Sequence, residues 1–241
     1  MTIRLMPLNQ QLAINHLLVR LPTDSWERWQ HALVPVQLQA GRVLFEDEAH
    51  LTHLYFPTSA ILSISHLLRD GESIEVAMIG SEGVAGAASL LGRSLSNHRG
   101  MVLRSGLAYR LKSAWLESEL KSSPLFLQMM LRYSQSLISQ ISQVLACSCH
   151  HHVEKRLSRW LLMYADRAGS TSILFTQEQL ANSLGVRRER LAKAASELQK
   201  KGFIQYSRGS IDICNSRALQ ADTCECYGVI KATYAPIFHS T

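Results

Sequence analysis

Residues 176–201, TQEQLANSLGVRRERLAKAASELQKK, decide how the C-terminal third of the chain folds. Thr176 and Gln179 have the spacing of a capping box, which satisfies backbone N–H groups at the start of a helix. Gly185 allows that helix to end in a sharp turn. A second helix is expected from about Arg187, with inward-facing residues at Leu191, Ala194, Ala195 and Leu198. This order predicts a helix-turn-helix, whose second helix enters the major groove of DNA.

The second helix leaves a basic face toward solvent, made of Arg187, Arg188, Glu189, Arg190 and Lys193. Arginine can donate two hydrogen bonds to guanine, a carboxylate can accept from the cytosine amino group, and lysine can reach guanine or phosphate. Arg188, Glu189 and Lys193 therefore suit a G·C-containing half-site. A glutamate is unsuited to a purely phosphate-binding face, so Glu189 favours base reading. The alternatives are a solvated amphipathic helix pair and an intrahelical pair between Glu189 and Lys193.

Residues 203–213 predict a β-hairpin directly after this helix. Two apolar runs flank Ser207-Arg208-Gly209-Ser210, and glycine is typical of such a turn. A helix-turn-helix followed by a hairpin is a winged helix. Arg208 at the hairpin tip would lie near a phosphate backbone, or would be only a solvated turn residue. We also include Thr176 and Gln177, at the start of the first helix, among the expected DNA contacts.

Length and composition indicate a folded protein of two domains. The chain has 241 residues, of which 46% are hydrophobic and 18% charged. No apolar run approaches the roughly 18 residues that span a bilayer, and the N-terminus lacks the pattern of a signal peptide. Five cysteines, none before Cys147, do not indicate a secreted disulfide framework. We expect a cytoplasmic protein with reduced thiols and no membrane association.

Positive charge is concentrated in the C-terminal third. Residues 1–150 contain 12 lysines and arginines against 11 aspartates and glutamates, whereas residues 151–241 contain 13 against 8. Basic residues draw a protein to polyphosphate by releasing condensed counterions, which gives affinity that weakens with salt. The distribution favours double-stranded DNA as a partner.

Residues from about 35 to 112 predict β structure. The candidate strands are VQLQ, RVLF, HLYF, AILSIS, SIEVAMI and GLAYRL, several of them with the apolar alternation of half-buried strands. Asp70-Gly71 is a strong hairpin signal. Short strands at this spacing indicate a sandwich or a barrel.

A long helix is expected after the β region. Ser123 and Pro124 suit the cap and first turn of a helix, and neither proline nor glycine recurs before Gly169. The spacing of a coiled-coil seam is found at Met130, Ser134, Leu137, Ile141, Val144 and Ser148. This seam predicts a dimer; the alternative is a helix that packs on its own β domain.

The rest of the chain predicts two further helices. After a break near residues 149–152, an apolar stripe runs to Gly169 and would support the two DNA-binding helices. Residues 227–234 predict a helix in a C-terminal tail. The expected organisation is a β domain at residues 1–122, a dimerisation helix at 123–148 and a winged helix-turn-helix with its tail at 149–241.

The order of these parts resembles the Crp/Fnr family of bacterial transcription regulators. The segment LGVRRERLAKAASEL resembles the family's recognition helix, VEKRLSRWLL the opening helix of its DNA-binding domain, and IGSEGVAG a glycine-containing loop of its effector domain. Arg188, Glu189 and Lys193 fall on the family's base-contacting positions, the third of which is usually arginine.

This resemblance implies an α+β fold with an N-terminal β-roll of the jelly-roll type, a long dimerisation helix and a C-terminal winged helix-turn-helix. It also implies a homodimer on a near-palindromic site, with half-sites about 34 Å apart. An activator of this type would contact RNA polymerase as well.

The effector loop departs from the pattern of the cyclic-nucleotide members. Those members place a Gly-Glu pair, and later an arginine followed by a small hydroxyl residue, against ribose and cyclic phosphate. Here the pair is split as Gly80-Ser81-Glu82, and Arg99 is followed by glycine. Cyclic AMP is therefore not expected, although Gly80, Glu82, Gly83 and Arg99 form the candidate effector-binding set. The alternative is a loop whose glycines serve only the fold, and the sequence identifies no effector or cofactor.

Cysteine and histidine residues gather at two places outside this pattern, CSCHHH and CEC, which contain Cys147, Cys149, His150, His151, Cys224 and Cys226. The cysteine cluster that iron–sulfur members carry near the N-terminus is missing from this chain. On a helix Cys147 would share a face with His150 and His151, which suits zinc, copper or haem iron. We assign no metal site from the sequence because no fixed fourth ligand can be named. A hinge without any ligand is the alternative.

The main hypothesis is therefore a homodimeric, DNA-binding transcription regulator that receives a signal at its β domain. The competing hypothesis is a metal- or redox-responsive protein that uses residues 147–152, and a third is a regulator that acts only through protein contacts. An enzyme is not expected, because the β region contains no nucleophile–base pair, no P-loop and no zinc-protease histidine pair.

Overall fold

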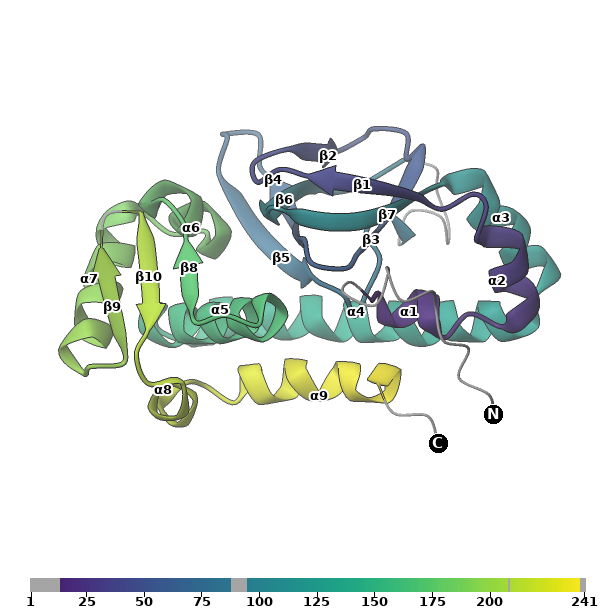
Figure 1. Ribbon diagram of the computed structural model, residues 1–241. Helices are drawn as coiled ribbons and strands as arrows, with labels where there is room; N and C mark the ends of the chain where they lie inside the picture. Colours follow the sequence, from purple (N-terminus) through teal and green to yellow (C-terminus); the bar gives the residue numbers. More distant parts are fainter. Residues whose placement is uncertain (1–13, 88–94, 208, 239–241) are drawn as a thin grey trace.

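The structure, a computed structural model, describes residues 14–87, 95–207 and 209–238 (Figure 1). Its helices are α1 His16–Val19, α2 Thr23–Trp29, α3 Ser113–Ser122, α4 Pro124–His150, α5 Val153–Ala168, α6 Gln177–Leu184, α7 Arg188–Lys200, α8 Ser216–Asp222 and α9 Cys226–Phe238. Its strands are β1 Val34–Leu38, β2 Val43–Phe45, β3 His53–Pro57, β4 Ile61–Leu67, β5 Ser73–Ile79, β6 Arg99–Arg104, β7 Gly106–Lys112, β8 Ser172–Leu174, β9 Ile204–Ser207 and β10 Ser210–Ile213. The fold is α+β, with a β-rich N-terminal domain, a long helix and a helical C-terminal domain.

Antiparallel strands form two sheets in the N-terminal domain, in the orders β1-β7-β3 and β2-β6-β4-β5. The turn at Asp70-Gly71 joins β4 to β5, with a positive φ of 87° at Gly71. Strand β6 was not predicted, because Gly100 interrupts its apolar pattern. A Cβ atom at Gly100 would lie 2.3 Å from the ring of Phe45 on the paired strand β2. Glycine is therefore needed for the two strands to pack.

Helix α4 begins as the sequence predicts. Pro124 occupies its first turn, and the Ser123 hydroxyl accepts a hydrogen bond from the Phe126 N–H at 3.3 Å. The predicted coiled-coil seam is wrong in register, because Met130, Leu137 and Val144 are buried within this chain. The large apolar residues of α4 that are exposed are instead Leu125, Leu127, Leu131, Ile138 and Leu145.

The C-terminal domain contains the predicted helix-turn-helix and hairpin. Gly185 ends α6 with a left-handed φ of 59°, and α7 begins three residues later at Arg188, with Arg187 as its N-cap. Strands β9 and β10 pair as a hairpin, and β8 adds a third strand that the sequence did not reveal. Arg208, predicted at the hairpin tip, lies outside the described residues.

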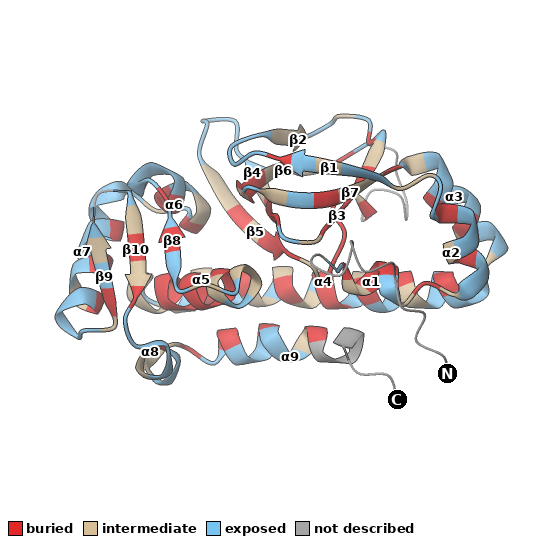
Figure 2. Ribbon diagram, viewed as in Figure 1, coloured by how far each residue is buried: buried red, intermediate tan, exposed pale blue. Residues whose placement is uncertain are grey.

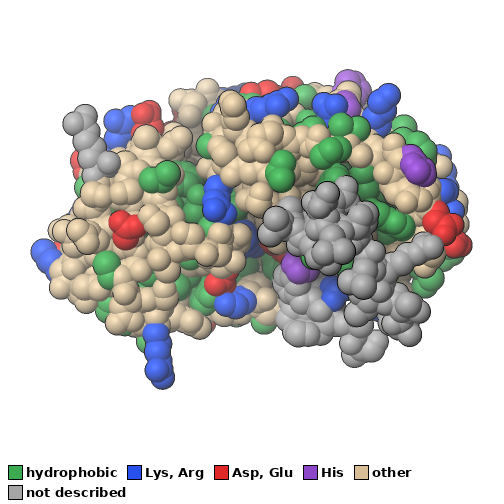
Figure 3. All heavy atoms as spheres, in the orientation of Figure 1, with side chains coloured by type: hydrophobic (Ala, Val, Ile, Leu, Met, Phe, Trp, Pro, Cys, Tyr) green, Lys and Arg blue, Asp and Glu red, His purple; other side chains and the backbone are tan. Residues whose placement is uncertain are grey.

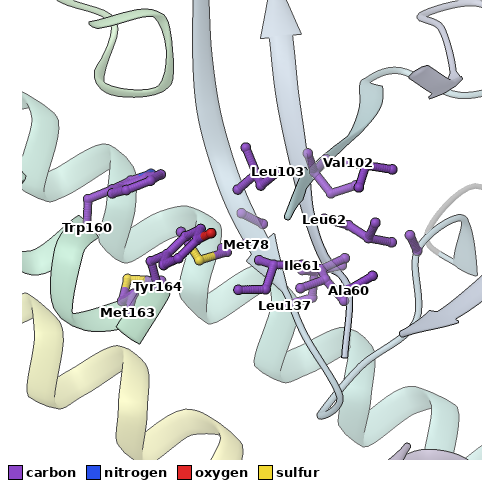
Figure 4. Packing of buried hydrophobic residues seen from close by; sticks show 14 of the residues in the cluster. Ala60, Ile61, Leu62, Met78, Val102, Leu103, Leu137, Trp160, Met163 and Tyr164 are labelled. Atoms are coloured by element: carbon purple, nitrogen blue, oxygen red, sulfur yellow. The ribbon is translucent and has the colours of Figure 1, made fainter. Parts of the chain in front are cut away.

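A continuous hydrophobic core joins the two domains. Figure 4 shows Trp160, Met163 and Tyr164 of α5 approaching residues of the β sheets, with Leu137 of α4 near the junction. The middle of α5 is buried on nearly all sides (Figure 2). The C-terminal domain is thus packed on the β domain. None of the helices in the described ranges is both long and apolar enough to cross a membrane.

Helix α9 extends the tail helix predicted at residues 227–234. It runs beside α4 and α5 (Figure 1). The Ser136 hydroxyl of α4 donates to the Thr233 carbonyl at 2.9 Å, and the Tyr227 hydroxyl donates to Asp166 of α5 at 2.8 Å. The tail therefore belongs to the junction between the domains.

Candidate nucleic-acid interface

The start of α7 presents its charged side chains to solvent. Arg187, Arg188, Glu189, Arg190 and Lys193 are all exposed, as the sequence predicts. The helix is held by its opposite side, on which Leu191, Ala194, Ala195 and Leu198 are buried. We call the five exposed residues the reading face. Because nothing in the described chain covers it, its leading side chains are free to approach a base-pair edge.

Arg188 forms an ion pair with Glu178 of α6, with 2.8 Å between Nη2 and Oε1. The two side chains are 59% and 62% exposed, and such surface pairs contribute less than about 1 kcal/mol. The pair therefore costs little to break when Arg188 contacts DNA. In the part of the chain that the structure describes, Glu189 forms no ion pair, so the intrahelical pair with Lys193 is not made.

The start of α6 is exposed as well. Thr176 and Gln179 form the predicted capping box: the Thr176 hydroxyl accepts from the Gln179 N–H at 3.1 Å, and the Thr176 N–H donates to the Gln179 side chain at 2.9 Å. Gln177 follows at the first helical position and is exposed. A helix N-terminus with free N–H groups is a common place for phosphate to bind.

Lysine and arginine side chains on the face shown in Figure 3 are scattered over the molecule. They do not form one broad positive patch on that face. The exposed reading face is thus the feature that suits DNA binding, and the positive charge of residues 151–241 would add to the affinity.

The predicted effector loop is fixed by contacts with its own chain. The Tyr133 hydroxyl of α4 donates to the Val84 carbonyl at 2.8 Å and accepts from the Val84 N–H at 3.1 Å. A Cβ atom at Gly83 would lie 2.7 Å from that hydroxyl oxygen. The Asn15 side chain also donates to the Gly83 carbonyl at 2.8 Å. Gly83 is therefore required for the loop to pack against α4.

Glu82 connects this loop to the C-terminal domain. Its carboxylate accepts from Arg167 of α5 at 2.7 Å and from the Gly80 N–H at 3.1 Å, and both charged side chains are about nine-tenths buried. Arg167 also donates to the Gln140 side chain of α4 at 3.2 Å. Beside this pair is a cavity of about 370 Å³ lined by His16, Ser81, Glu82, Met163, Asp166, Arg167, Tyr227, Ile230, Lys231 and Tyr234.

The four candidate effector residues do not form one group in the structure. Gly80, Glu82 and Gly83 share the loop, whereas Arg99 lies on β6 and pairs with Glu46 at 3.2 Å. Glu82 is the member of the set that lines the cavity described above.

A second buried carboxylate, Glu75, lies between the domains, and sequence reasoning missed it. It accepts from the Ser63 hydroxyl of β4 at 2.8 Å and from the Trp160 indole N–H of α5 at 2.9 Å. Burial raises its pKa to about 7, although both hydrogen bonds and the positive charges of Arg159 and Arg167 act in the opposite direction. The sequence signal that could have revealed this buried carboxylate is the single glutamate in the otherwise mostly apolar run SIEVAMI.

Four of the six cysteine and histidine residues noted in the sequence meet at one place. The cluster consists of Cys147, His151, Cys224 and Cys226, whose ligand atoms all lie within 4.8 Å of one another. The Cys147 and Cys224 sulfurs are hydrogen-bonded at 3.7 Å, and this hydrogen bond lowers the pKa of Cys224. Cys149 and His150 are exposed and lie outside the cluster.

Comparison with known proteins gives two matching family models. The Crp-like helix-turn-helix domain matches residues 155–222, and the cyclic nucleotide-binding domain matches residues 35–123. Together they cover both halves of the fold. No curated protein matches the sequence.

Several solved structures share the fold. A regulator assigned to the crp/fnr family of Eubacterium rectale has 20% identity and a TM-score of 0.69, over 83% of this chain and 94% of that chain. FixK2 of Bradyrhizobium japonicum has 14% identity and a TM-score of 0.68, over 80% and 98%. The c-di-GMP-responsive global regulator CLP of Xanthomonas campestris has 14% identity and a TM-score of 0.66, over 80% and 99%. At these identities the likeness concerns the fold.

Proposed function

The chain belongs to the Crp/Fnr family of DNA-binding transcription regulators, and we propose that it acts as a homodimer on a near-palindromic site under control of a signal received by its β domain. The observation that carries the proposal is the reading face, which is basic, exposed and held on a buried scaffold. The protein is a regulator and not an enzyme.

We assign base reading to Arg188, Glu189 and Lys193. Arg188 would donate two hydrogen bonds to a guanine once it leaves Glu178, and Glu189 would accept from a cytosine amino group. Lys193 is one helical turn further on and would reach guanine or phosphate. The three together favour a half-site that contains G·C pairs.

The remaining members of the predicted DNA-binding set are assigned to the phosphate backbone. Arg187 and Arg190 flank the base-reading residues, and Thr176 and Gln177 lie at the exposed start of α6. Arg208, which lies outside the described residues, completes the set from the sequence alone, between the residues of β9 and β10. Such contacts position the helix and contribute the salt-dependent part of the affinity.

Selection of binding sites from random duplex DNA tests this assignment. The wild-type chain should enrich a two-fold symmetric site, with half-sites about one helical turn apart. The triple variant Arg188→Ala, Glu189→Ala, Lys193→Ala should lose the enrichment, whereas Lys200→Ala, exposed at the far end of the same helix, should keep it. Equal enrichment by the triple variant and the wild type would contradict the proposal.

The exposed stripe on α4 supports the homodimer. Leu131, Ile138 and Leu145 recur every seven residues and are more than half exposed, with Leu127 one turn earlier. A seven-residue apolar repeat is the pattern of a helix that pairs with another helix. Because the opposite side of α4 is buried against its own chain, we propose that this stripe faces the second copy.

Light scattering on eluted protein tests the dimer. Ile138→Glu places a charge in the middle of the stripe and should convert the dimer to a monomer. Leu107→Glu makes the same kind of change at an exposed leucine on β7 and should leave the dimer intact. If the Ile138→Glu variant remains a dimer as stable as the wild type, the two copies pair through another surface.

We propose that the loop with Gly80, Glu82 and Gly83 passes the signal to the DNA-binding domain. The support is direct contact: Glu82 is paired with Arg167 of α5, and the same loop contacts Tyr133 of α4. An effector in the adjoining cavity would change these contacts if it bound one arrangement of the domains better than the other. Arg99, whose partner Glu46 follows the end of β2, would act separately.

Glu82→Gln tests this route. The change should alter operator affinity about fivefold or more, because it removes a buried charge pair between the domains. Glu72→Gln, an exposed glutamate in the same domain, should have no effect. If both variants bind the operator like the wild type, the loop does not transmit the signal.

A further inference from the structure

The cluster of Cys147, His151, Cys224 and Cys226 joins two segments that are far apart in the sequence. Cys147 is in the last turn of α4, and His151 caps that helix one turn later, so both side chains project from the same face. Cys224 lies between α8 and α9, and Cys226 begins α9. The two pairs of residues are thus brought together by the packing of α9 along α4.

Two distances within the cluster are those of a tetrahedral zinc site, and all four ligand atoms lie within 4.8 Å of one another. Bonds of about 2.3 Å to sulfur and 2.0–2.1 Å to nitrogen place two sulfurs about 3.8 Å apart, and a sulfur and a nitrogen about 3.6 Å apart. The Cys147 and Cys224 sulfurs are separated by 3.7 Å, and the Cys226 sulfur is 3.5 Å from His151 Nδ1. A disulfide requires about 2.0 Å, so none of the five cysteines is bonded in this arrangement.

Surrounding side chains orient these groups as they do in known metal sites. The second nitrogen of His151, Nε2, lies 3.6 Å from a Glu225 carboxylate oxygen, which leaves Nδ1 directed at the sulfurs. Gln143, one turn before Cys147 on α4, donates to the Cys226 sulfur at 3.1 Å. Hydrogen bonds from outside the ligand set fix ligand orientation in proteins that bind metals.

The buried Arg159 lies close enough to both the cluster and the Glu75 carboxyl group for its positive charge to act on them. Arg159 of α5 is 3% exposed, and its Nε atom has no hydrogen-bond partner. Its guanidinium donates at 3.6 Å to the sulfur of Met163, and across the described ranges it forms no ion pair. Arg159 is within electrostatic range of Cys147. A zinc ion with three thiolates and one neutral histidine carries a net charge of −1, which would compensate this arginine.

We propose that Cys147, His151, Cys224 and Cys226 bind one Zn²⁺ ion in a closed tetrahedral site. Three buried thiolates and one imidazole suit a soft divalent ion, and four protein ligands leave no position for a substrate. The ion would fasten α9 to the end of α4, where the chain turns into α5. Its role would be structural, at the hinge between the long helix and the DNA-binding domain.

Metal analysis of the full-length protein, purified under reducing conditions, tests the site without reference to DNA binding. The wild type should retain about one zinc per chain. Cys226→Ser should lose it, whereas the exposed neighbours altered in Cys149→Ser and His150→Ala should retain it. Removal of the ion from the wild type by a chelator should lower Tm by about 5 °C or more.

Reconstitution with Co²⁺ keeps the proposal testable if the Cys226 variant does not fold. Cobalt bound to the chelator-treated wild type should give the thiolate charge-transfer and tetrahedral ligand-field absorption expected of a site with three cysteines and one histidine. Zinc should displace it. Absence of both bound zinc and the cobalt spectrum in reduced wild-type protein would overturn the proposal. So would a Cys147–Cys224 disulfide in the freshly purified protein, which would show a redox pair at this place.

Discussion

Replacement of Glu75 by glutamine should remove a loss of stability that the buried carboxyl group between the domains causes as the pH rises. The carboxyl group is buried against Ser63 and Trp160, and its pKa is raised from the usual 4.5 to about 7. The folded chain therefore keeps a proton that the unfolded chain has already released. Stability is full below about pH 4.5, falls as the pH rises, and reaches its lower level above about pH 7.

The size of the effect follows from the shift. One pKa unit corresponds to 1.36 kcal/mol, and between about pH 5 and pH 8 the wild type should lose about 2.5 kcal/mol of unfolding free energy relative to Glu75→Gln. Urea denaturation followed by circular dichroism across that range measures the difference. Glu72→Gln, an exposed carboxyl in the same hairpin, is the control and should track the wild type. A difference between wild type and Glu75→Gln that does not change with pH would refute this reasoning.

Two further changes test the geometry of the helix-turn-helix. Glu178→Gln should strengthen operator binding by about two- to fivefold, because Arg188 then does not have to break an ion pair worth less than about 1 kcal/mol before it contacts DNA. Weaker binding in a fluorescence anisotropy titration would mean that Glu178 positions Arg188 for DNA. Gly185→Ala should lower the unfolding free energy by about 1–2 kcal/mol at a φ of 59°, and by more than Gly169→Ala at the same φ, because the added methyl lies 3.2 Å from Ile74. Equal losses in urea denaturation would show that the Ile74 contact carries no strain.

The C-terminal domain could be predicted from sequence because its signals are local. The capping box at Thr176, the turn at Gly185 and the basic start of α7 each depend on residues within a few positions of one another. The same holds for the hairpin at Asp70-Gly71 and for the start of α4 at Pro124. In each case one or two residues cap the backbone N–H groups of a helix or allow the backbone conformation of a turn. Such residues can be recognised from the sequence alone.

The parts that could not be predicted depend on contacts across the fold. Strand β6 contains Gly100 because Phe45 packs over it, and no local pattern reveals that need. The seam of α4 was placed on the wrong face because both faces are apolar, and only the packing of α9 and β5 shows which one remains exposed. Likewise, Cys147 and Cys224 are 77 residues apart in the sequence, so only the folded position of α9 shows that they are in contact.

The most direct test of the central claim measures how the reading face discriminates among bases. Dissociation constants at fixed salt would be compared for the selected operator and for a set of single base-pair changes, using wild type, Arg188→Ala and Lys200→Ala. The wild type and Lys200→Ala should discriminate about 5- to 150-fold at each contacted pair, and Arg188→Ala should lose that discrimination at one G·C position in each half-site. If Arg188→Ala keeps the full discrimination at every position, α7 does not read the sequence through that residue.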